Sequence, residues 1–306
     1  MTLTLISHAD CQLHENFSGH PESPQRLSAI NDQLISSGID VVLLPVDAPL
    51  ATREQLIRVH SEAYVDQVFA RAPKEGSIEL AEDTCMSPHT LQAALRSAGA
   101  GIEAVDRLFS GKTHTAFCNV RPPGHHAGKG FAMGFCIFNN IAVAAAHALE
   151  EYNLERVAIV DFDVHHGNGT ENIFTQDNRV LLCSSFQHPF YPYTGDESTP
   201  DHIINLPLPA GTAQAEFRQQ VSDTFLPALH DFKPQLILIS AGFDGHLEDE
   251  MADMNLTEAD YSWITKELKK IADTYAEGRM VSFLEGGYDL SALGRSVVAH
   301  LKAMME

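Results

Sequence analysis

Short apolar runs alternate with longer amphipathic stretches along most of this chain. The apolar runs are too short for helices and rich in branched residues, so they predict strands. We expect strands at residues 3–7, 41–44, 114–120, 156–161, 179–185, 202–206, 235–240 and 280–284. The amphipathic stretches predict helices at residues 24–37, 52–71, 88–110, 139–150, 212–231, 257–276 and 289–304.

The segment 88–110 shows the helical pattern most clearly. Its apolar residues recur at three- and four-residue spacing, which places them on one face of a helix. They are Leu91, Leu95, Ala98, Ile102, Val105 and Phe109. In the segment 257–276, Thr257 is followed three residues later by Asp260, which predicts a capping box at the start of a helix.

The alternation of strands and helices indicates the fold class. Strands that are apolar on both faces predict an α/β fold, in which helices cover both faces of a mostly parallel sheet of about eight strands. A chain of 306 residues can form one large domain of this kind with a full core. The sequence contains no internal repeat and no low-complexity linker, so we expect a single domain over residues 1–306.

Polar and glycine-rich sequence follows several of the predicted strands. The segments are RPPGHHA at 121–127, DFDVHHGNG at 161–169, AGFDGH at 241–246 and EGGY at 285–288. Open parallel sheets bind their ligands at the carboxyl ends of the strands. We therefore expect these segments to meet in one crevice.

The DFDVHHGNG segment predicts a metal site. Residues two apart on extended backbone point to the same side, so Asp161, Asp163 and His165 would cluster there. Two carboxylates beside an imidazole are costly to bury unless a cation lies between them. With Asp244, Asp163 and His165 offer the oxygen and nitrogen ligands of an open catalytic zinc site. The competing interpretation is that these side chains only hydrogen-bond the loop backbone.

The adjacent histidines His125 and His126 predict acid–base chemistry. They follow a rigid Pro-Pro pair and Gly124, which favours a shaped turn over a chance pair on the surface. An imidazole beside a metal site can take a proton from water and pass it to a leaving amine. It needs an orienting partner for its second ring nitrogen, and Asp161 and Asn168 are the candidates.

Three aromatic residues have a functional and a structural interpretation. Tyr288 follows two glycines that allow its loop to approach a ligand closely, so its phenol could stabilise a developing oxyanion. Phe135 and Tyr191 could form the walls of a narrow apolar channel. Alternatively, each of the three rings only packs in the core.

Composition excludes several classes of partner. The formal charge of −21 results from 20 Lys and Arg against 41 Asp and Glu. A negative field of this size disfavours nucleic acid and anionic membranes and attracts cationic substrates, although it also serves solubility. The 5 cysteines form no CxxC pair, which argues against a disulfide framework or a cysteine-rich zinc site. The N-terminal segment predicts neither a signal peptide nor a transmembrane helix, so we expect a cytoplasmic location.

Together these motifs resemble the zinc-dependent histone deacetylase family, which includes bacterial histone deacetylase-like amidohydrolases, acetylpolyamine amidohydrolases and acetoin-utilisation proteins. The resemblance spans nearly the whole chain, from HPESPQR at 20–26 to EGGY at 285–288. It implies an arginase/deacetylase-like fold. It also implies hydrolysis of an acetylated lysine side chain or a small acetylated amine, with release of acetate and the free amine.

The resemblance also implies roles for single residues. One zinc ion per chain would be bound by Asp163, His165 and Asp244. His126 would act as general base and acid with support from Asn168, and Asp161 would support His125. Tyr288 would polarise the substrate carbonyl.

Substrate contacts are implied for Asp83, Gly134, Phe135, Tyr191 and Met251. Phe135 and Tyr191 would form opposite walls of the acyl-lysine channel. Met251 matches a hydrophobic residue of the channel rim, where dedicated polyamine deacetylases can carry a glutamate, and Glu250 is adjacent. Asp83 is the candidate that grips the substrate backbone.

The family also binds a structural potassium ion beside the zinc. The matching residues are Asp161, Ser184 and Ser185, with the carbonyl oxygens of Asp163 and His165. A second monovalent site is implied near Phe174, Asp177 and Val180. Asn168 replaces the aspartate of class I members and Tyr288 is kept, so the chain resembles class II.

Two other functions compete with deacetylation. A two-metal ureohydrolase resembling arginase needs a carboxylate-rich bridge, and neither Gly167-Asn168-Gly169 nor Gly245-His246 supplies a second ligand set. A binding module without turnover would not need His125, His126 and Tyr288, which are all present.

Overall fold

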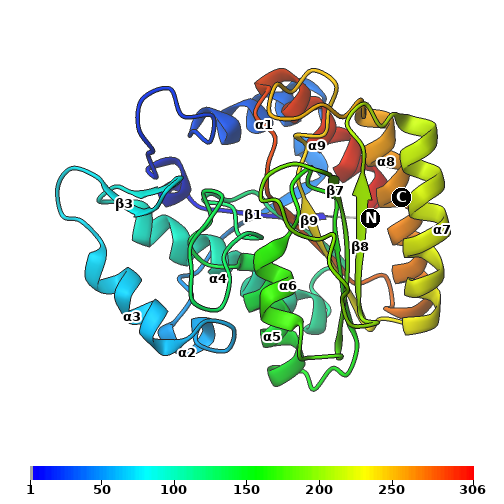
Figure 1. Ribbon diagram of the computed structural model, residues 1–306, viewed down its shortest axis with the longest axis horizontal. Helices are drawn as coiled ribbons and strands as arrows, with labels where there is room; N and C mark the ends of the chain where they lie inside the picture. Colours follow the sequence, from blue (N-terminus) through cyan, green and yellow to red (C-terminus); the bar gives the residue numbers. More distant parts are fainter. Residues whose placement is uncertain (1–2) are drawn as a thin grey trace.

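The computed structural model describes residues 3–306, so the first two residues of the expected domain lie outside the description. An 8-stranded sheet crosses the molecule (Figure 1). Its strands are β1 (Leu3–Ser7), β2 (Leu43–Asp47), β5 (Thr115–Cys118), β6 (Val157–Asp161), β7 (Val180–Gln187), β8 (Ile203–Leu208), β9 (Leu236–Ala241) and β10 (Met280–Leu284). The order is β2-β1-β5-β10-β9-β6-β7-β8, and all pairings are parallel. The predicted α/β fold is confirmed.

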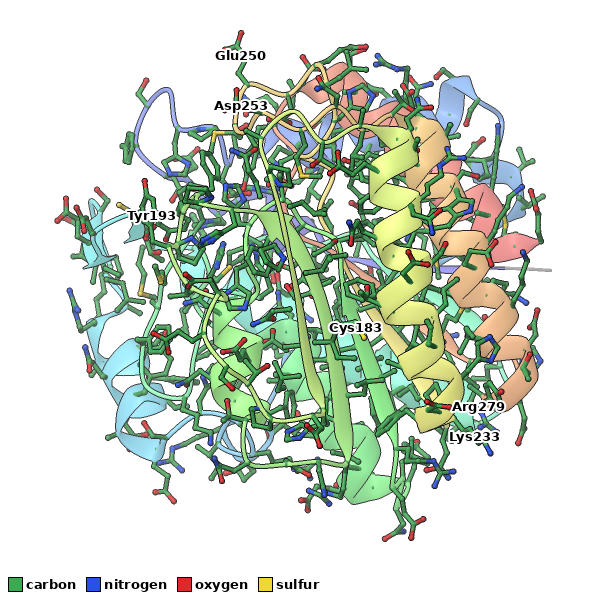
Figure 2. The ribbon with its side chains drawn as sticks, turned by 45° about the vertical axis from the view of Figure 1, so that its right-hand side comes forward. Cys183, Tyr193, Lys233, Glu250, Asp253 and Arg279 are labelled. Carbon is green, nitrogen blue, oxygen red and sulfur yellow. The ribbon has the colours of Figure 1, made fainter. Side chains whose placement is uncertain are left out.

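Helices cover both faces of the sheet. One layer contains α1 (Gln25–Ser36), α7 (Gln214–Phe232), α8 (Glu258–Tyr275) and α9 (Leu290–Met305), and Figure 2 shows α7 and α8 side by side. The other contains α4 (Thr90–Phe109), α5 (Asn140–Glu151) and α6 (Asn168–Phe174). Outside these layers lie η1 (Ala9–Gln12), η2 (Asp40–Val42), α2 (Arg53–Leu56) and α3 (Glu62–Arg71). Within residues 3–306, no helix has both the length and the apolar character needed to cross a bilayer.

Local capping fixes where several helices begin. The side chain of Asn139 accepts a backbone N–H from the first turn of α5 at 3.0 Å, and Asp289 does the same for α9 at 2.8 Å. At the start of α8, the Asp260 carboxylate accepts the N–H of Thr257 at 2.9 Å, as the capping box predicts. Two of these caps directly follow loops that carry candidate site residues.

The single helix predicted over 52–71 is wrong, because the structure contains the separate helices α2 and α3. Ser61 caps α3 with its hydroxyl. Next to it, the buried His60 places Nδ1 2.8 Å from the carbonyl oxygen of Gly128, and its Nε2 accepts the N–H of Asn139 at 3.0 Å. These hydrogen bonds to distant segments fix the break, which the hydrophobic pattern does not show.

Several short elements were not predicted, including the 3-10 helices η1 and η2. A hairpin of β3 (Ile78–Ala81) and β4 (Thr84–Met86) forms a separate antiparallel sheet. The short helix α6 begins at Asn168 and Gly169, which are poor helix formers, and it packs against α5 and β7. Tertiary contacts rather than local propensity therefore stabilise it.

The sheet order explains how distant motifs meet. The motif-bearing strands β5, β10, β9 and β6 are consecutive neighbours in the middle of the sheet. Because they are parallel, their carboxyl ends lie at one edge, where such sheets bind ligands. The segments that follow them therefore form a single crevice.

We expect close packing around Gly99 to be essential for stability. A Cβ at this position of α4 would lie 2.0 Å from the carbonyl oxygen of Pro49, in a loop bonded to the helix through Ala51 N–H and Leu95 O. Gly99→Ala should lower the free energy of unfolding by about 1–3 kcal/mol, despite the better helix propensity of alanine. Denaturant unfolding measures this change.

Gly130→Ala is the matched control. A Cβ there would meet only Ser61 Oγ, at 3.9 Å, so its effect should stay within about 0.5 kcal/mol. Equal stability of the two variants would contradict the close contact at Gly99.

Candidate functional site

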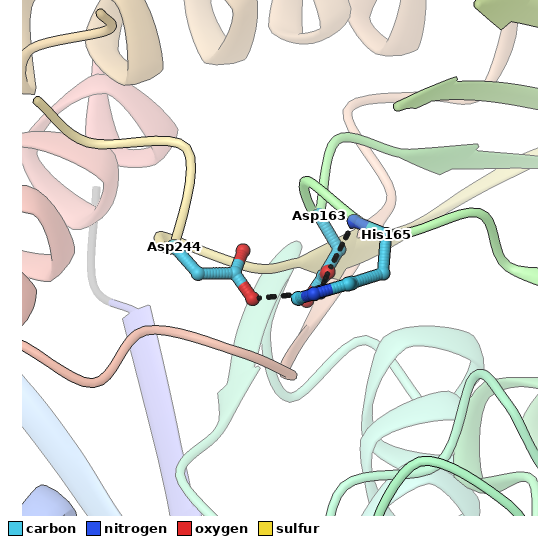
Figure 3. A group of neighbouring side chains, drawn as sticks. All are labelled: Asp163, His165 and Asp244. Carbon is cyan, nitrogen blue, oxygen red and sulfur yellow. Dashed lines mark hydrogen bonds and ion pairs between the residues drawn. The ribbon is translucent and has the colours of Figure 1, made fainter. Parts of the chain in front are cut away.

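Two carboxylates and an imidazole converge at the centre of the crevice. Asp163 and His165 follow β6, and Asp244 follows the neighbouring strand β9. One possible ligand atom from each lies within 4.8 Å of the others, and all three residues are buried (Figure 3). The Nδ1 atom of His165 lies 3.0 Å from Asp163 Oδ1 and 3.2 Å from Asp244 Oδ2.

The charges of this triad fit a divalent cation. Burial alone would lower the pKa of His165, but the carboxylates of Asp163 and Asp244 raise it to about 10. Burial and the charge of Asp163 raise the pKa of Asp244 to about 6. Apart from its ion pair with His165, the buried Asp244 Oδ2 makes no hydrogen bond within residues 3–306. Two carboxylates and one imidazole are a suitable donor set for zinc, and a cation bound between them would contact this oxygen.

Glycines allow the backbone to approach the triad. A Cβ at Gly242 would lie 2.1 Å from Asp163 Oδ2, and one at Gly286 would lie 2.0 Å from Asp244 Oδ2. The N–H of Gly286 donates to Asp163 Oδ2 at 2.8 Å, and the N–H of Val164 donates to Asp244 Oδ1 at 3.1 Å. The glycines in AGFDGH and EGGY therefore make room for the two carboxylates.

The structure places each of the two histidines beside its expected partner. His125 Nδ1 lies 2.9 Å from Asp161 Oδ2, and His126 Nδ1 lies 2.7 Å from Asn168 Oδ1. Both partner oxygens are acceptors, so each ring donates from Nδ1 and directs Nε2 elsewhere. The Nε2 atom of His125 lies 3.8 Å from Asp163 Oδ2, which places this ring beside the triad.

The two imidazoles differ in their affinity for a proton. Burial would lower the pKa of His125, but Asp161 and Asp163 raise it well above its usual value. Burial, together with His125 and His165, holds the pKa of His126 well below its usual value. Two rings whose pKa values are shifted in opposite directions thus lie side by side, with centroids 4.0 Å apart. Groups with pKa values driven apart in this way are typical of acid–base catalysis.

A cavity of about 310 Å³ opens onto these groups. Its lining includes all the expected substrate-contact residues, namely Asp83, Gly134, Phe135, Tyr191 and Met251. His125, His126 and Tyr288 also line it. Burial raises the pKa of Tyr288 well above its usual value, so its phenol stays protonated and can donate a hydrogen bond.

The residues expected to bind potassium lie on neighbouring strands. Asp161 pairs with Ser184 in the register of β6 and β7, and Ser185 follows. Phe174, Asp177 and Val180 form a turn, in which the N–H of Asp177 donates to Phe174 O at 2.9 Å and the N–H of Val180 donates to Asp177 O at 3.1 Å. Both monovalent sites stay predictions.

Sequence reasoning missed Glu285, the residue that holds the histidine turn in place. Its carboxylate is fully buried and accepts the N–H groups of Gly124 at 2.7 Å and His125 at 3.2 Å. Burial raises the pKa of Glu285 to about 7. An acidic residue directly after an apolar strand was the available signal.

A buried ion network behind the site was also missed. Arg121 Nη2 donates to Glu22 Oε2 at 2.6 Å, and Arg26 Nη1 lies 3.3 Å from Glu22 Oε1. Burial would raise the pKa of Glu22, but Arg121 and His14 hold it well below its usual value. Arg26 Nε also donates to the carbonyl oxygen of Gly287 at 2.7 Å. The network therefore fixes the loop that carries Tyr288.

Known proteins are similar to this chain in sequence and in fold. A family model described as the histone deacetylase domain matches residues 20–304. This chain belongs to the histone deacetylase family. It is therefore a hydrolytic deacetylase, and zinc dependence is general to that family.

Individual relatives cover the whole domain. Histone deacetylase 14, chloroplastic, of Arabidopsis thaliana is 36% identical over 98% of this chain and 76% of its own length. Polyamine deacetylase HDAC10 of Mus musculus is 35% identical over 100% of this chain and 48% of its own length. The crystal structure of the HDA15 HD domain superposes with a TM-score of 0.92 at 34% identity, covering 100% of this chain and 90% of that chain.

We expect zinc binding to depend on Asp244. Asp244→Asn removes one of the two carboxylate charges and should lower zinc affinity by at least about 100-fold. Loss of a residue that only hydrogen-bonds a metal ligand already costs up to about 100-fold. Glu250→Gln removes the same charge from an exposed side chain at the surface (Figure 2) and should leave affinity unchanged. Metal analysis after dialysis against a competing chelator measures both, and equal zinc retention would contradict the assignment.

Proposed function

We propose that this protein is a zinc-dependent amidohydrolase that removes acetyl groups from lysine side chains or small acetylated amines, releasing acetate and the free amine. The observation that carries the proposal is that the group of Asp163, His165 and Asp244 adjoins a cavity that two histidines and a tyrosine also line. A cation site, a proton acceptor and a hydrogen-bond donor are the components that amide hydrolysis at a metal requires.

Each residue has a distinct role in the proposed reaction. A zinc ion bound by the triad supplies Lewis acidity towards the acetyl carbonyl and towards water. His126 is neutral and bonded through Nδ1 to Asn168, so its Nε2 lone pair accepts the proton of the attacking water. The same ring then returns the proton to the leaving amine.

Two further residues stabilise the negative charge that develops on the carbonyl oxygen. Tyr288 donates a hydrogen bond from its phenol to this oxygen. Its raised pKa means that the phenol keeps its proton. His125 carries positive charge beside Asp161, which lowers the local energy of an oxyanion. Glu285 keeps the histidine turn in position through its two backbone contacts.

The cavity supports a slender amide substrate. Phe135 and Tyr191 are apolar walls for the aliphatic stem of an acetylated amine, and they exclude water from the reacting groups. The net charge of −21 attracts cationic substrates and disfavours nucleic acid. Within residues 3–306, one group of side chains has the spacing to hold a metal ion, namely Asp163, His165 and Asp244. This supports one metal ion rather than the two of an arginase-like enzyme.

The metal dependence tests the proposal directly. The zinc-loaded protein should hydrolyse a fluorogenic acetyl-lysine substrate, lose activity on treatment with chelator and regain it on addition of one equivalent of zinc. Acetylpolyamines and longer acyl-lysines in the same assay define the preferred amine. Undiminished hydrolysis by fully stripped protein would falsify the proposal.

We expect Tyr288→Phe to lower kcat by about 10²–10³, the usual loss for one oxyanion donor. The phenyl ring keeps its packing beside Phe135, where the ring centroids are 6.2 Å apart. Zinc content and thermal unfolding should therefore match the unchanged protein. Near-full turnover by this variant would exclude the proposed role of the phenol.

A further inference from the structure

The β3–β4 hairpin holds one wall of the cavity. Both oxygens of the Asp83 carboxylate lie 3.1 Å from the backbone nitrogen of Gly134, and the hydroxyl of Thr84 accepts the N–H of Phe135 at 3.1 Å. Gly134 and Phe135 have φ values of 56° and 68°. A positive φ is unfavourable for a bulky residue such as phenylalanine and persists only where neighbours impose it. The hairpin supplies that constraint.

The same carboxylate also contacts Tyr191, a second aromatic residue of the cavity lining. The hydroxyl of Tyr191 donates to Asp83 Oδ2 at 2.5 Å. Burial, together with the neighbouring Asp83, raises the pKa of Tyr191, so the phenol retains its proton. The Tyr191 ring also lies close to the catalytic groups, with centroids 5.5 Å from His126 and 5.9 Å from His165. Asp83 thus connects the two walls beside the reacting centre.

The acceptor capacity of Asp83 is largely used within the protein. Its oxygens accept from the N–H of Gly134 and from the hydroxyls of Thr84, at 2.9 Å, and Tyr191. A carboxylate offers about four lone-pair sites. These bonds serve the walls of the channel, whereas a substrate would find little free capacity on this group.

The loop that carries Tyr191 has a second anchor. Beyond Tyr191, the hydroxyl of Thr194 lies 2.8 Å from Nδ1 of the buried His166. The far end of the loop is therefore fixed independently of Asp83. Loss of the Tyr191 hydroxyl should release the wall alone and leave the rest of the loop in place.

We propose that Tyr191 is a specificity-determining residue, whose hydrogen bond to Asp83 ties the two channel walls together and sets a width that admits an acetyl group but disfavours longer acyl chains. The inference rests on the proposed function, since it concerns the acyl group of the amide to be hydrolysed. The strap formed by Asp83 and Tyr191 acts on the walls and not on the reacting atoms, so its loss should change selectivity more than turnover of the acetyl substrate.

Tyr191→Phe tests the hydrogen bond to Asp83, because it removes the hydroxyl and keeps the ring. We compare kcat/KM for acetyl-, butyryl- and hexanoyl-lysine peptides of one sequence. The ratio of hexanoyl to acetyl should rise about tenfold, the lower range for pockets that discriminate by methylene groups. Tyr193→Phe is the matched control, since this tyrosine is two residues away and 74% exposed (Figure 2). Its ratio should stay unchanged.

Asp83→Asn provides a second variant that weakens the same hydrogen bond. Its effect on the hexanoyl-to-acetyl ratio and that of Tyr191→Phe should be non-additive in the double variant, because both act on the same hydrogen bond. Thermal unfolding and zinc content show that each variant is folded and loaded. If the hexanoyl-to-acetyl ratio of kcat/KM is unchanged in both folded single variants, the proposed role of the Asp83–Tyr191 hydrogen bond is wrong.

Calorimetric binding of the same peptides separates this inference from the proposed function. If the zinc-loaded wild type binds acyl-lysine peptides without hydrolysing them, the proposed function fails. The dependence of Kd on acyl length then tests whether the Asp83–Tyr191 hydrogen bond limits the acyl group. Tyr191→Phe should tighten hexanoyl binding relative to acetyl binding, and identical length profiles for the variant and the wild type would reject it.

Discussion

Mutual repulsion between the buried carboxylates of Asp163 and Asp244 is the constraint around which the crevice is organised. The two groups follow neighbouring parallel strands, and both are buried. Backbone N–H groups of Val164 and Gly286 each stabilise one of them. His165 provides the remaining compensation, which explains its strong affinity for a proton. A divalent cation satisfies the same demand more completely, because it neutralises both charges at once.

The negative charge of this centre also differentiates the surrounding groups. Burial and two other imidazoles lower the pKa of His126, whereas the carboxylates of Asp161 and Asp163 overcome burial and raise the pKa of His125. Identical side chains adjacent in the sequence thus differ in their affinity for a proton. Their difference arises from three-dimensional neighbours and from the shared turn that Glu285 holds.

Much of the fold follows from the sequence because the strands of the main sheet are buried on both faces and read as plain apolar runs. The candidate site could be predicted for the same reason, since motifs that follow parallel strands must lie at one edge of the sheet. Local patterns did not show the break before Ser61, the β3–β4 hairpin or α6, which depend on distant partners such as the hydrogen bonds of His60. The ion network of Glu22, Arg26 and Arg121 was equally hidden, since Arg121 lies 99 positions away from Glu22 in the sequence.

That network has a consequence for the order in which the protein assembles. Arg26 and Gly287 are separated by 261 positions, yet their hydrogen bond holds the tyrosine loop. Contacts between such remote parts of a chain form slowly, because a very large loop must close first. During vectorial synthesis the ion pairs of Glu22 can form early, whereas the bond from Arg26 to Gly287 can form only after β10 has been made. Because β10 joins the two halves of the sheet, the loop that carries Tyr288 reaches its place only when those halves come together.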